Sequence, residues 1–267
     1  MTIPLHDSLR TILDEVRQVT GKNVEFIQKT DLPSFAMAKL ARRSMPRHLV
    51  LYTTDREPFI NYMFAHECGH ILRMFRVPEE KRLIPMWNEQ MIEIARREFM
   101  DELPELVQLL GKDKFIHVTH NWHNELIRKV TNLASDLMIE RWLYDDFQDL
   151  RNEQRQAYDW WAKDAEEGLS SENLKMVPHK AWESTNTMDY VFFKLLDKHI
   201  QSTYLTAYQG TEFAEKGNLL ADLTERTYQN DYEGDIRMVN EWAKFLGLTE
   251  WFGWTGFEDV REDYHAQ

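Results

Sequence analysis

The stretch FAHECGHILRMF, residues 64–75, contains two histidines four residues apart. In an α-helix, residues i and i+4 lie one turn apart on the same face. His66 and His70 can therefore present both imidazoles to a single metal ion. Apolar residues occupy almost every other side of the stretch, which predicts a buried helix whose polar groups need partners. These apolar neighbours are Phe59, Ile60, Met63, Phe64, Ile71, Leu72 and Phe75.

Glu67 follows the first histidine and lies about 100° around the helix from it. From there its carboxylate can reach a water on the metal rather than the metal itself. This HExxH pattern places a general base beside a catalytic metal in metallohydrolases. A plainer interpretation is two core histidines bonded to neighbours, with Glu67 in a salt bridge. The cost of burying three polar groups without a ligand favours the metal.

A catalytic zinc needs a third protein ligand, and the helix predicted over residues 124–147 carries two candidates. Asp136 and Glu140 lie one turn apart on a face that is otherwise largely apolar. A buried carboxylate without a partner is costly, so metal coordination would explain its position. We prefer Asp136 as the ligand, with Glu140 as a substitute ligand or as a hydrogen-bonding partner behind the ligands. The plainer alternative is a buried acid that pairs with an arginine or caps a loop.

The residues before the HExxH motif predict one helix and three strands. Apolar residues recur at helical spacing over residues 5–19, and Gly21 stands just past the predicted end. The segments NVEFIQ, FAMAKLAR and HLVLYTT predict the strands of a small antiparallel sheet. Thr54 or Asp55 would then cap the HExxH helix, with Pro58 in its first turn.

HECGH followed by NLASDLMIE resembles the zincin metallopeptidases, in which a second helix delivers an acidic third ligand. The resemblance is to metallopeptidases with an N-x-A-x-D-x-x-I signature. The upstream order of strands and helix is also similar to that of gluzincins and ImmA/IrrE-like peptidases. The resemblance covers roughly residues 24–147. The signature positions are held by Asn132, Ala134, Asp136 and Ile139.

The resemblance implies a zincin-like core that binds one zinc ion through His66, His70 and Asp136, with Glu67 as the base. Two related patterns are not met. Leu133 stands where a thermolysin-type N-E-x-x-S-D pattern has glutamate, and HILRMFRVPEE holds no third histidine of the metzincin kind.

The remainder of the chain is predicted to be mainly helical. Residues 86–110 predict a helix closed by Gly111, and DKFIHVTHNWHNEL predicts a loop or helix entry. That segment carries His117, His120 and His123, one of which could face the active-site cleft and stabilise an oxyanion. Further helices are predicted at AYDWWAKDAEE, TMDYVFFKLLDKHI and DIRMVNEWAKFLGL.

These elements together predict a predominantly α-helical α+β fold with a small antiparallel sheet before the HExxH helix. The zincin-like metallopeptidase core would occupy residues 1–150. Residues 151–267 would form a helical extension packed on that core.

The composition limits the partners and the compartment. The chain has 267 residues and a formal net charge of -13, and such a negative field repels nucleic-acid phosphates. No run approaches the roughly 18 apolar residues of a membrane span, and the N-terminus lacks a secretory signal. The single cysteine, Cys68, can form no internal disulfide and is expected to pack in the core. We therefore expect a cytoplasmic protein that acts on a peptide or protein substrate; its oligomeric state stays open.

The same sequence is also compatible with two other functions. Ferritin-like di-iron proteins carry paired Glu-x-x-His motifs, which Glu67 with His70 and Glu262 with His265 could supply. The third possibility is a non-catalytic, metal-stabilised scaffold that binds a protein through the aromatic segment EWFGWTGFEDVRED.

Overall fold

The computed structural model describes residues 4–260, except residues 33, 54–57, 103, 171–174 and 176. Most of the described chain is helical, and its strands form one three-stranded and one two-stranded sheet. The prediction of a predominantly helical α+β fold is therefore confirmed. Within these described ranges, every helix is too short or too polar to cross a lipid bilayer.

The described chain forms two compact units, each assembled from separate segments. Unit 1 contains residues 4–83, 135–161 and 256–260, and unit 2 contains residues 84–134 and 162–255. The division predicted near residue 150 falls inside unit 1. The reason is that the helices α5 (Lys112–Asp146) and α6 (Arg151–Gly168) each supply residues to both units.

Unit 1 contains the sheet and the HExxH helix. Its strands are β1 (Asn23–Gln28), β2 (Ala36–Lys39) and β3 (Arg47–Tyr52), in the order β1-β3-β2. β2 runs antiparallel to β3, as predicted, but β1 runs parallel to β3, with Val24 opposite His48 and Phe26 opposite Val50. The sheet is therefore mixed rather than antiparallel. Alternation of apolar residues predicts strands but not their neighbours, and β1 lies beside β3 instead of pairing with β2.

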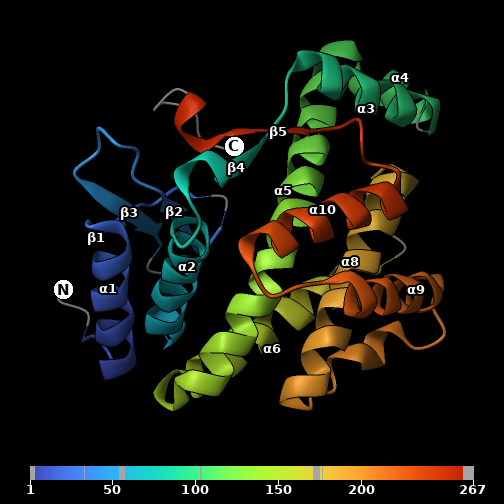
Figure 1. Ribbon diagram of the computed structural model, residues 1–267. Coiled ribbons are helices and arrows are strands. Elements are labelled where there is room, and N and C mark those ends of the chain that lie inside the picture. The colour runs from blue at the N-terminus through green and yellow to red at the C-terminus, as the bar shows by residue number, and fades with distance from the viewer. Residues whose placement is uncertain are drawn as a thin grey trace. The chain divides into compact units, whose positions relative to one another are not determined.

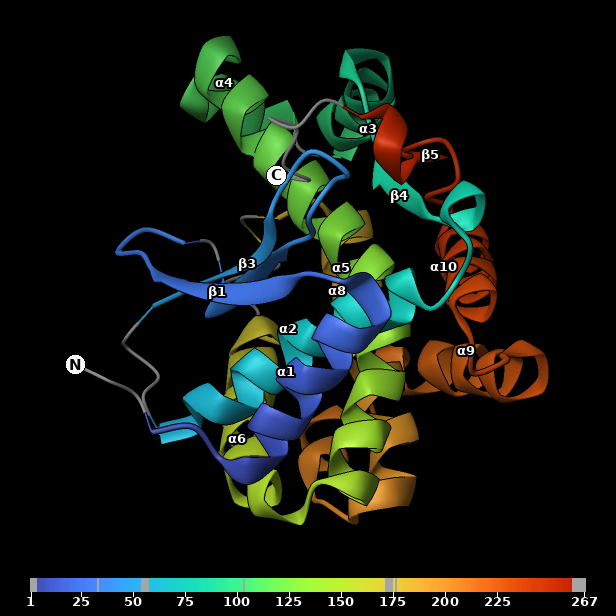
Figure 2. The same cartoon turned by 60° about the vertical axis from the view of Figure 1, so that its left-hand side comes forward.

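Two helices pack together beneath this sheet. α1 (Asp7–Thr20) contacts α2 (Ile60–Phe75), and both views show them side by side with the strands at one end (Figure 1, Figure 2). α1 ends where predicted: Gly21 has a φ of 71°, and its N–H donates to the carbonyl of Arg17. Phe26 of β1 stacks on Phe64 of α2, with ring centroids 4.0 Å apart. α1 also contacts β1 and α2 also contacts β2, so the core of unit 1 lies between this pair of helices and the sheet.

The HExxH helix ends at Phe75, as predicted from its apolar pattern. Its start follows Phe59 directly, whereas the predicted caps Thr54 and Asp55 lie outside the described residues. Short 3-10 helices complete unit 1 at Glu79–Lys81, Gln148–Leu150 and Phe257–Asp259.

Unit 2 is built from helices and most of a two-stranded sheet of β4 (Leu83–Met86) and β5 (Gly253–Gly256), whose residues 83 and 256 belong to unit 1. In place of one predicted helix over residues 86–110 it has α3 and α4, and proline suits the first position of the second helix. The helix α9 packs against both α8 and α10. The remaining bounds are α3 (Glu89–Glu102), α4 (Pro104–Leu110), α8 (His179–Ile200), α9 (Glu212–Thr227), α10 (Tyr232–Leu246) and a 3-10 turn at Tyr204–Tyr208.

The histidine-rich segment before residue 124 is helical, not a loop. Gly111, with a φ of 75°, ends α4, and α5 begins at the next residue. No glycine or proline occurs between Lys112 and Asp146, so nothing in the backbone interrupts the helix. His117, His120 and His123 therefore lie along its first turns.

Candidate metal centre

The two imidazoles of the HExxH helix meet at one point of unit 1. His66 and His70 lie on successive turns of α2, and their Nε2 atoms are 3.1 Å apart. The His66 side chain is 11% exposed and that of His70 is 23% exposed, so solvent reaches the pair mainly from the His70 side. The predicted convergence of the two rings is present.

Asp136 of α5 completes a group of three possible ligand atoms. Its Oδ1 lies 3.1 Å from His70 Nε2 and 3.5 Å from His66 Nε2. All three atoms lie within 4.8 Å of one another, an arrangement that could hold a metal ion. Asp136 Oδ1 is buried, and these two imidazole nitrogens are its charged neighbours. A buried carboxylate is costly unless it is paired or coordinates an ion.

A glycine inside the motif allows the second helix to come this close. A Cβ atom on Gly69 would lie only 2.6 Å from Cγ2 of Ile139, a contact that real side chains do not make. Ile139 is 1% exposed and β-branched, so it has little freedom to move away. Asp136 stands three residues before Ile139 on the same helix. The small residue between the histidines therefore helps to bring the carboxylate to the imidazoles.

Glu140 lies on the opposite edge of the His66 ring. Its Oε1 accepts hydrogen bonds from His66 Nδ1 and from the Tyr62 hydroxyl, both at 2.6 Å. Its Oε2 accepts from Gln154 Nε2 at 2.6 Å and from the Tyr158 hydroxyl. The carboxylate is fully buried, and both oxygens are satisfied by protein donors. Of the two predicted third ligands, Asp136 is therefore the one that meets the Nε2 atoms.

The contact with Glu140 fixes which nitrogen of His66 carries a proton. A carboxylate only accepts hydrogen bonds, so Nδ1 must be the donor. In the neutral ring, Nε2 then carries the lone pair and points at His70 and Asp136. This is the usual arrangement behind a metal-binding histidine, where an acid on one nitrogen orients the other toward the ion.

The tyrosines around Glu140 remain donors at all ordinary pH values. Burial is the main reason that the pKa of Tyr62 lies well above 10, and the charge of Glu140 raises it further. The same two causes raise the pKa of Tyr158. Both tyrosine hydroxyls therefore keep donating to Glu140, and these bonds hold the carboxylate that orients His66.

Without a metal, the three-residue group is held together by charge. Burial alone would lower the pKa of His66, but hydrogen bonds and the charges of Asp136 and Glu140 outweigh it and raise that pKa well above 6.5. Burial likewise opposes ionisation of Asp136, yet its hydrogen bonds to the two histidines lower its pKa to about 2. Both carboxylates thus favour positive charge on the His66 ring.

Glu67 stands beside this group without belonging to it. Its Oε2 accepts a hydrogen bond of 2.7 Å from the backbone N–H of Ala38 on strand β2. The side chain is only partly buried, between the closed core and solvent. The bond orients the carboxylate, which is a suitable state for a general base.

The other predicted candidates lie elsewhere. His123 is fully buried in unit 2, where its Nε2 donates to the carbonyl of Trp251, and His117 is exposed. Neither these histidines nor His120 joins a metal-type cluster in the part of the chain that the structure describes. Cys68 is fully buried, as predicted, and burial raises the pKa of its thiol. The second Glu-x-x-His pair, Glu262 with His265, falls outside the described residues.

Three residues of the site were not predicted from the sequence, namely Tyr62, Gln154 and Tyr158. Gln154 and Tyr158 lie four apart on α6, so they share a helix face. Both are fully buried, which is unusual for a glutamine. A polar pair at this spacing could have suggested a buried hydrogen-bond network, but its partner Glu140 could not be read from it.

Comparison of the chain with models of known protein families, with curated proteins and with solved structures gave no match. The functional argument therefore depends on the geometry of this site.

Proposed function

We propose that the protein is a zinc-dependent metallopeptidase in which His66, His70 and Asp136 hold one zinc ion. The main support is the spacing of the three ligand atoms, which is 3.1, 3.1 and 3.5 Å. Ligand atoms around a tetrahedral zinc with bonds of about 2.05 Å are separated by about 3.3 Å. Three protein ligands also leave a fourth position free, as catalytic zinc sites do.

The donor set supports the same proposal. Two imidazoles and one carboxylate suit zinc, and the buried Asp136 oxygen that faces both Nε2 atoms would complete the ligand set. Glu140 behind His66 would stabilise the tautomer that binds. When bound, zinc would supply an activated water and polarise a substrate carbonyl.

The chain's own residues would then carry the proton transfers. Glu67 would take a proton from the attacking water and give it to the leaving amine. Its bond to the Ala38 N–H would hold the carboxylate in one orientation during both transfers. A peptide or protein is the substrate that this chemistry implies, and neither nucleic acid nor a membrane is needed. We also propose a cytoplasmic location, because the only cysteine is buried and unpaired.

The proposal is tested by separating metal binding from turnover. The full chain is stripped with a chelator, reloaded with zinc and incubated with a proteome-derived peptide library, and new termini are counted by mass spectrometry. Glu67→Gln should retain one zinc per chain yet cleave at least about a hundredfold more slowly, since it cannot accept the proton. Glu80→Gln, an exposed glutamate just after α2, is the matched control and should cleave normally.

Equal cleavage by Glu67→Gln and the wild type would contradict the assignment of the base. Zinc bound without cleavage of any peptide would favour the scaffold function. Two irons per chain after reconstitution would favour the di-iron function.

A further inference from the structure

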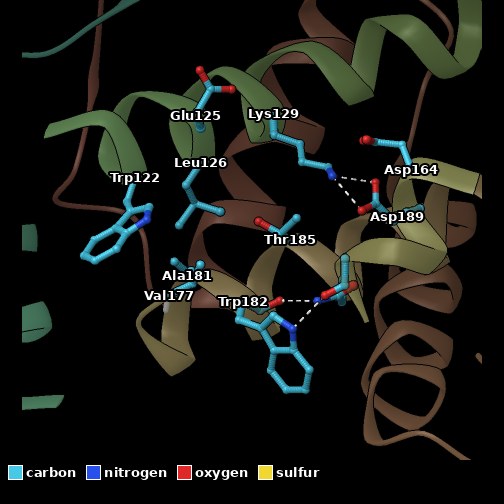
Figure 3. Close-up of a pocket in the computed structure, with 13 residues that line it drawn as sticks. Trp122, Glu125, Leu126, Lys129, Asp164, Val177, Ala181, Trp182, Thr185 and Asp189 are labelled. Atoms are coloured by element: carbon cyan, nitrogen blue, oxygen red, sulfur yellow. Dashed lines mark hydrogen bonds and ion pairs between the residues drawn. The ribbon is translucent and has the colours of Figure 1, made fainter. Parts of the chain in front are cut away.

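Unit 2 contains a cavity of about 300 Å³ between α5, α6 and α8 (Figure 3). That volume is at the lower end of the range for small-molecule sites. Every residue that lines it belongs to unit 2, so the cavity does not depend on the metal centre. The lining residues are Trp122, Glu125, Leu126, Lys129, Asp164, Ala165, Gly168, Val177, Ala181, Trp182, Thr185, Asn186 and Asp189.

The cavity has an apolar part and a charged part. Figure 3 shows Trp122, Leu126 and Trp182 on one side, and Lys129 with Asp189 and Asp164 on the other. The Lys129 ammonium contacts Asp189 at 2.6 Å. This contrast suits a ligand with an apolar body and one charged end.

The lining carries more negative than positive charge. Three carboxylates line the cavity against the single ammonium of Lys129. Asp189 pairs with Lys129, and Glu125 pairs with Arg128 outside the lining. Burial is the main reason that the pKa of Asp189 is raised, and the nearby charge of Asp164 raises it further although Lys129 lowers it. One lysine therefore does not neutralise the two aspartates, and a second cation would relieve the repulsion.

The lining also contains a buried hydrogen-bond acceptor without a donor. Asn186 is 2% exposed, and its Nδ2 donates to the carbonyl of Trp182. Its Oδ1 is buried and has no partner among the described residues. The indole N–H of Trp182 is already used by the carbonyl of Gly168. An occupant that donates hydrogen bonds would therefore find an acceptor in the Asn186 oxygen.

We propose that this cavity binds a small organic cation, a primary amine or guanidinium carried on a flat apolar body. The cationic group would lie near Asp164, Asp189 and Asn186, and the apolar body would lie toward the tryptophans. Aromatic faces also attract cations, which adds to the preference for positive charge. The net charge of -13 would favour the approach of such ligands.

The test compares three probes of similar shape and different charge. Phenethylamine, 2-phenylethanol and 3-phenylpropionate are titrated into the full chain by isothermal calorimetry. The amine should bind at least about tenfold more tightly than the alcohol, because only the amine brings positive charge and several donors. The carboxylate should not bind. Equal binding of amine and alcohol, or no binding of the amine, would overturn the proposal.

Two variants place the binding in this cavity. Asp164→Asn removes an exposed cavity carboxylate and should weaken amine binding roughly threefold to tenfold while leaving alcohol binding unchanged. Glu166→Gln, an exposed acid on the same helix that does not line the cavity, should change nothing. Thr185→Phe should fill the cavity and abolish amine binding in a protein that still melts cooperatively. Undiminished amine binding by folded Thr185→Phe would place the amine elsewhere and refute the proposal.

Discussion

The two edges of the His66 ring differ sharply, although two acids from the same helix face them. Asp136 approaches the Nε2 edge, and its buried Oδ1 lies 3.5 Å from His66 Nε2 and 3.1 Å from His70 Nε2. Glu140, one turn later, approaches the Nδ1 edge and accepts four hydrogen bonds from protein groups. An acid that accepts several protein hydrogen bonds can orient a neighbouring ring, whereas an acid that faces two imidazole nitrogens can share a metal ion with them. This difference distinguishes Asp136, the proposed ligand, from Glu140, which orients His66.

Removal of a ligand on the Nε2 edge should have the largest effect. His70→Ala should weaken zinc binding at least roughly a hundredfold, since one of three protein bonds to the ion is lost. Competition with a fluorescent chelator measures this affinity. His117→Ala, an exposed histidine of α5, is the control and should bind zinc as the wild type does. If both variants bind zinc equally well, His70 is not a ligand.

Neutralising the acid on the Nδ1 edge should have the next largest effect. Four donors surround the Glu140 carboxylate, so the amide N–H₂ of Glu140→Gln would face another donor and His66 would lose its orientation. We expect zinc affinity to fall roughly tenfold to a hundredfold, as in other outer-shell substitutions. Asp146→Asn, an exposed acid at the end of the same helix, controls for the charge change. A loss of zinc affinity as large as that of His70→Ala would indicate that Glu140 is a ligand after all.

The close helix contact that brings Asp136 to the histidines should respond to one added methyl group. Gly69→Ala would collide with Ile139 and should destabilise the fold by about 1–3 kcal/mol, as overpacking does. It should also weaken zinc binding, because α5 would move away from α2. Urea unfolding and zinc titration measure the two effects. Gly168→Ala has ordinary space around its new Cβ and should cost little. A Gly69→Ala protein of unchanged stability and affinity would show that the approach is not constrained.

Removal of one hydrogen-bond donor to Glu140 should have a smaller effect on zinc affinity and a measurable effect on stability. Tyr158→Phe removes one bond to a buried carboxylate and should cost about 1.5–3 kcal/mol of stability, measured by urea unfolding. Tyr190→Phe loses a bond to the neutral amide of Asn218 and should cost about 0.5–1.5 kcal/mol. Only Tyr158→Phe should also reduce zinc affinity. The reverse order of costs would mean that Glu140 does not depend on its donors.

The smallest expected effect is the dependence of stability and zinc affinity on pH. The folded pKa of His66 is raised, so its stabilising charge is present below pH 6.5 and is lost as pH rises through that raised pKa. The pKa of Asp136 is lowered to about 2, so its contribution is present above 3.8 and is lost as pH falls through about 2. Zinc must displace the His66 proton near neutrality, so its affinity should rise roughly tenfold between about pH 6 and about pH 7. Calorimetry in buffers of different ionisation enthalpy counts the proton, and a count of zero would contradict the raised pKa.

The sequence was sufficient to predict the residues that repeat at fixed spacing within one element. The 3.6-residue period placed His66 and His70 together, and Gly21 marked the end of α1. The apolar face of the later helix singled out both Asp136 and Glu140. Spacing alone could not decide between them, because that decision depends on how α5 and α6 pack against α2.

The features that the sequence did not predict depend on contacts between segments far apart in the chain. The parallel pairing of β1 with β3 and the interleaved units depend on long-range packing. The donors to Glu140 come from α2 and α6, which are about a hundred residues apart in sequence. The motif alone does not show why residue 69 is glycine. The structure does, because a Cβ atom there would collide with Ile139.

The most direct test of the central claim is a crystal structure of the zinc-loaded protein with anomalous data at the zinc edge. The account predicts one anomalous peak at about 2.0–2.2 Å from His66 Nε2, His70 Nε2 and a carboxylate oxygen of Asp136, with Glu140 still on His66 Nδ1. A peak bound elsewhere, two metal peaks, or none at this group under saturating zinc would contradict it.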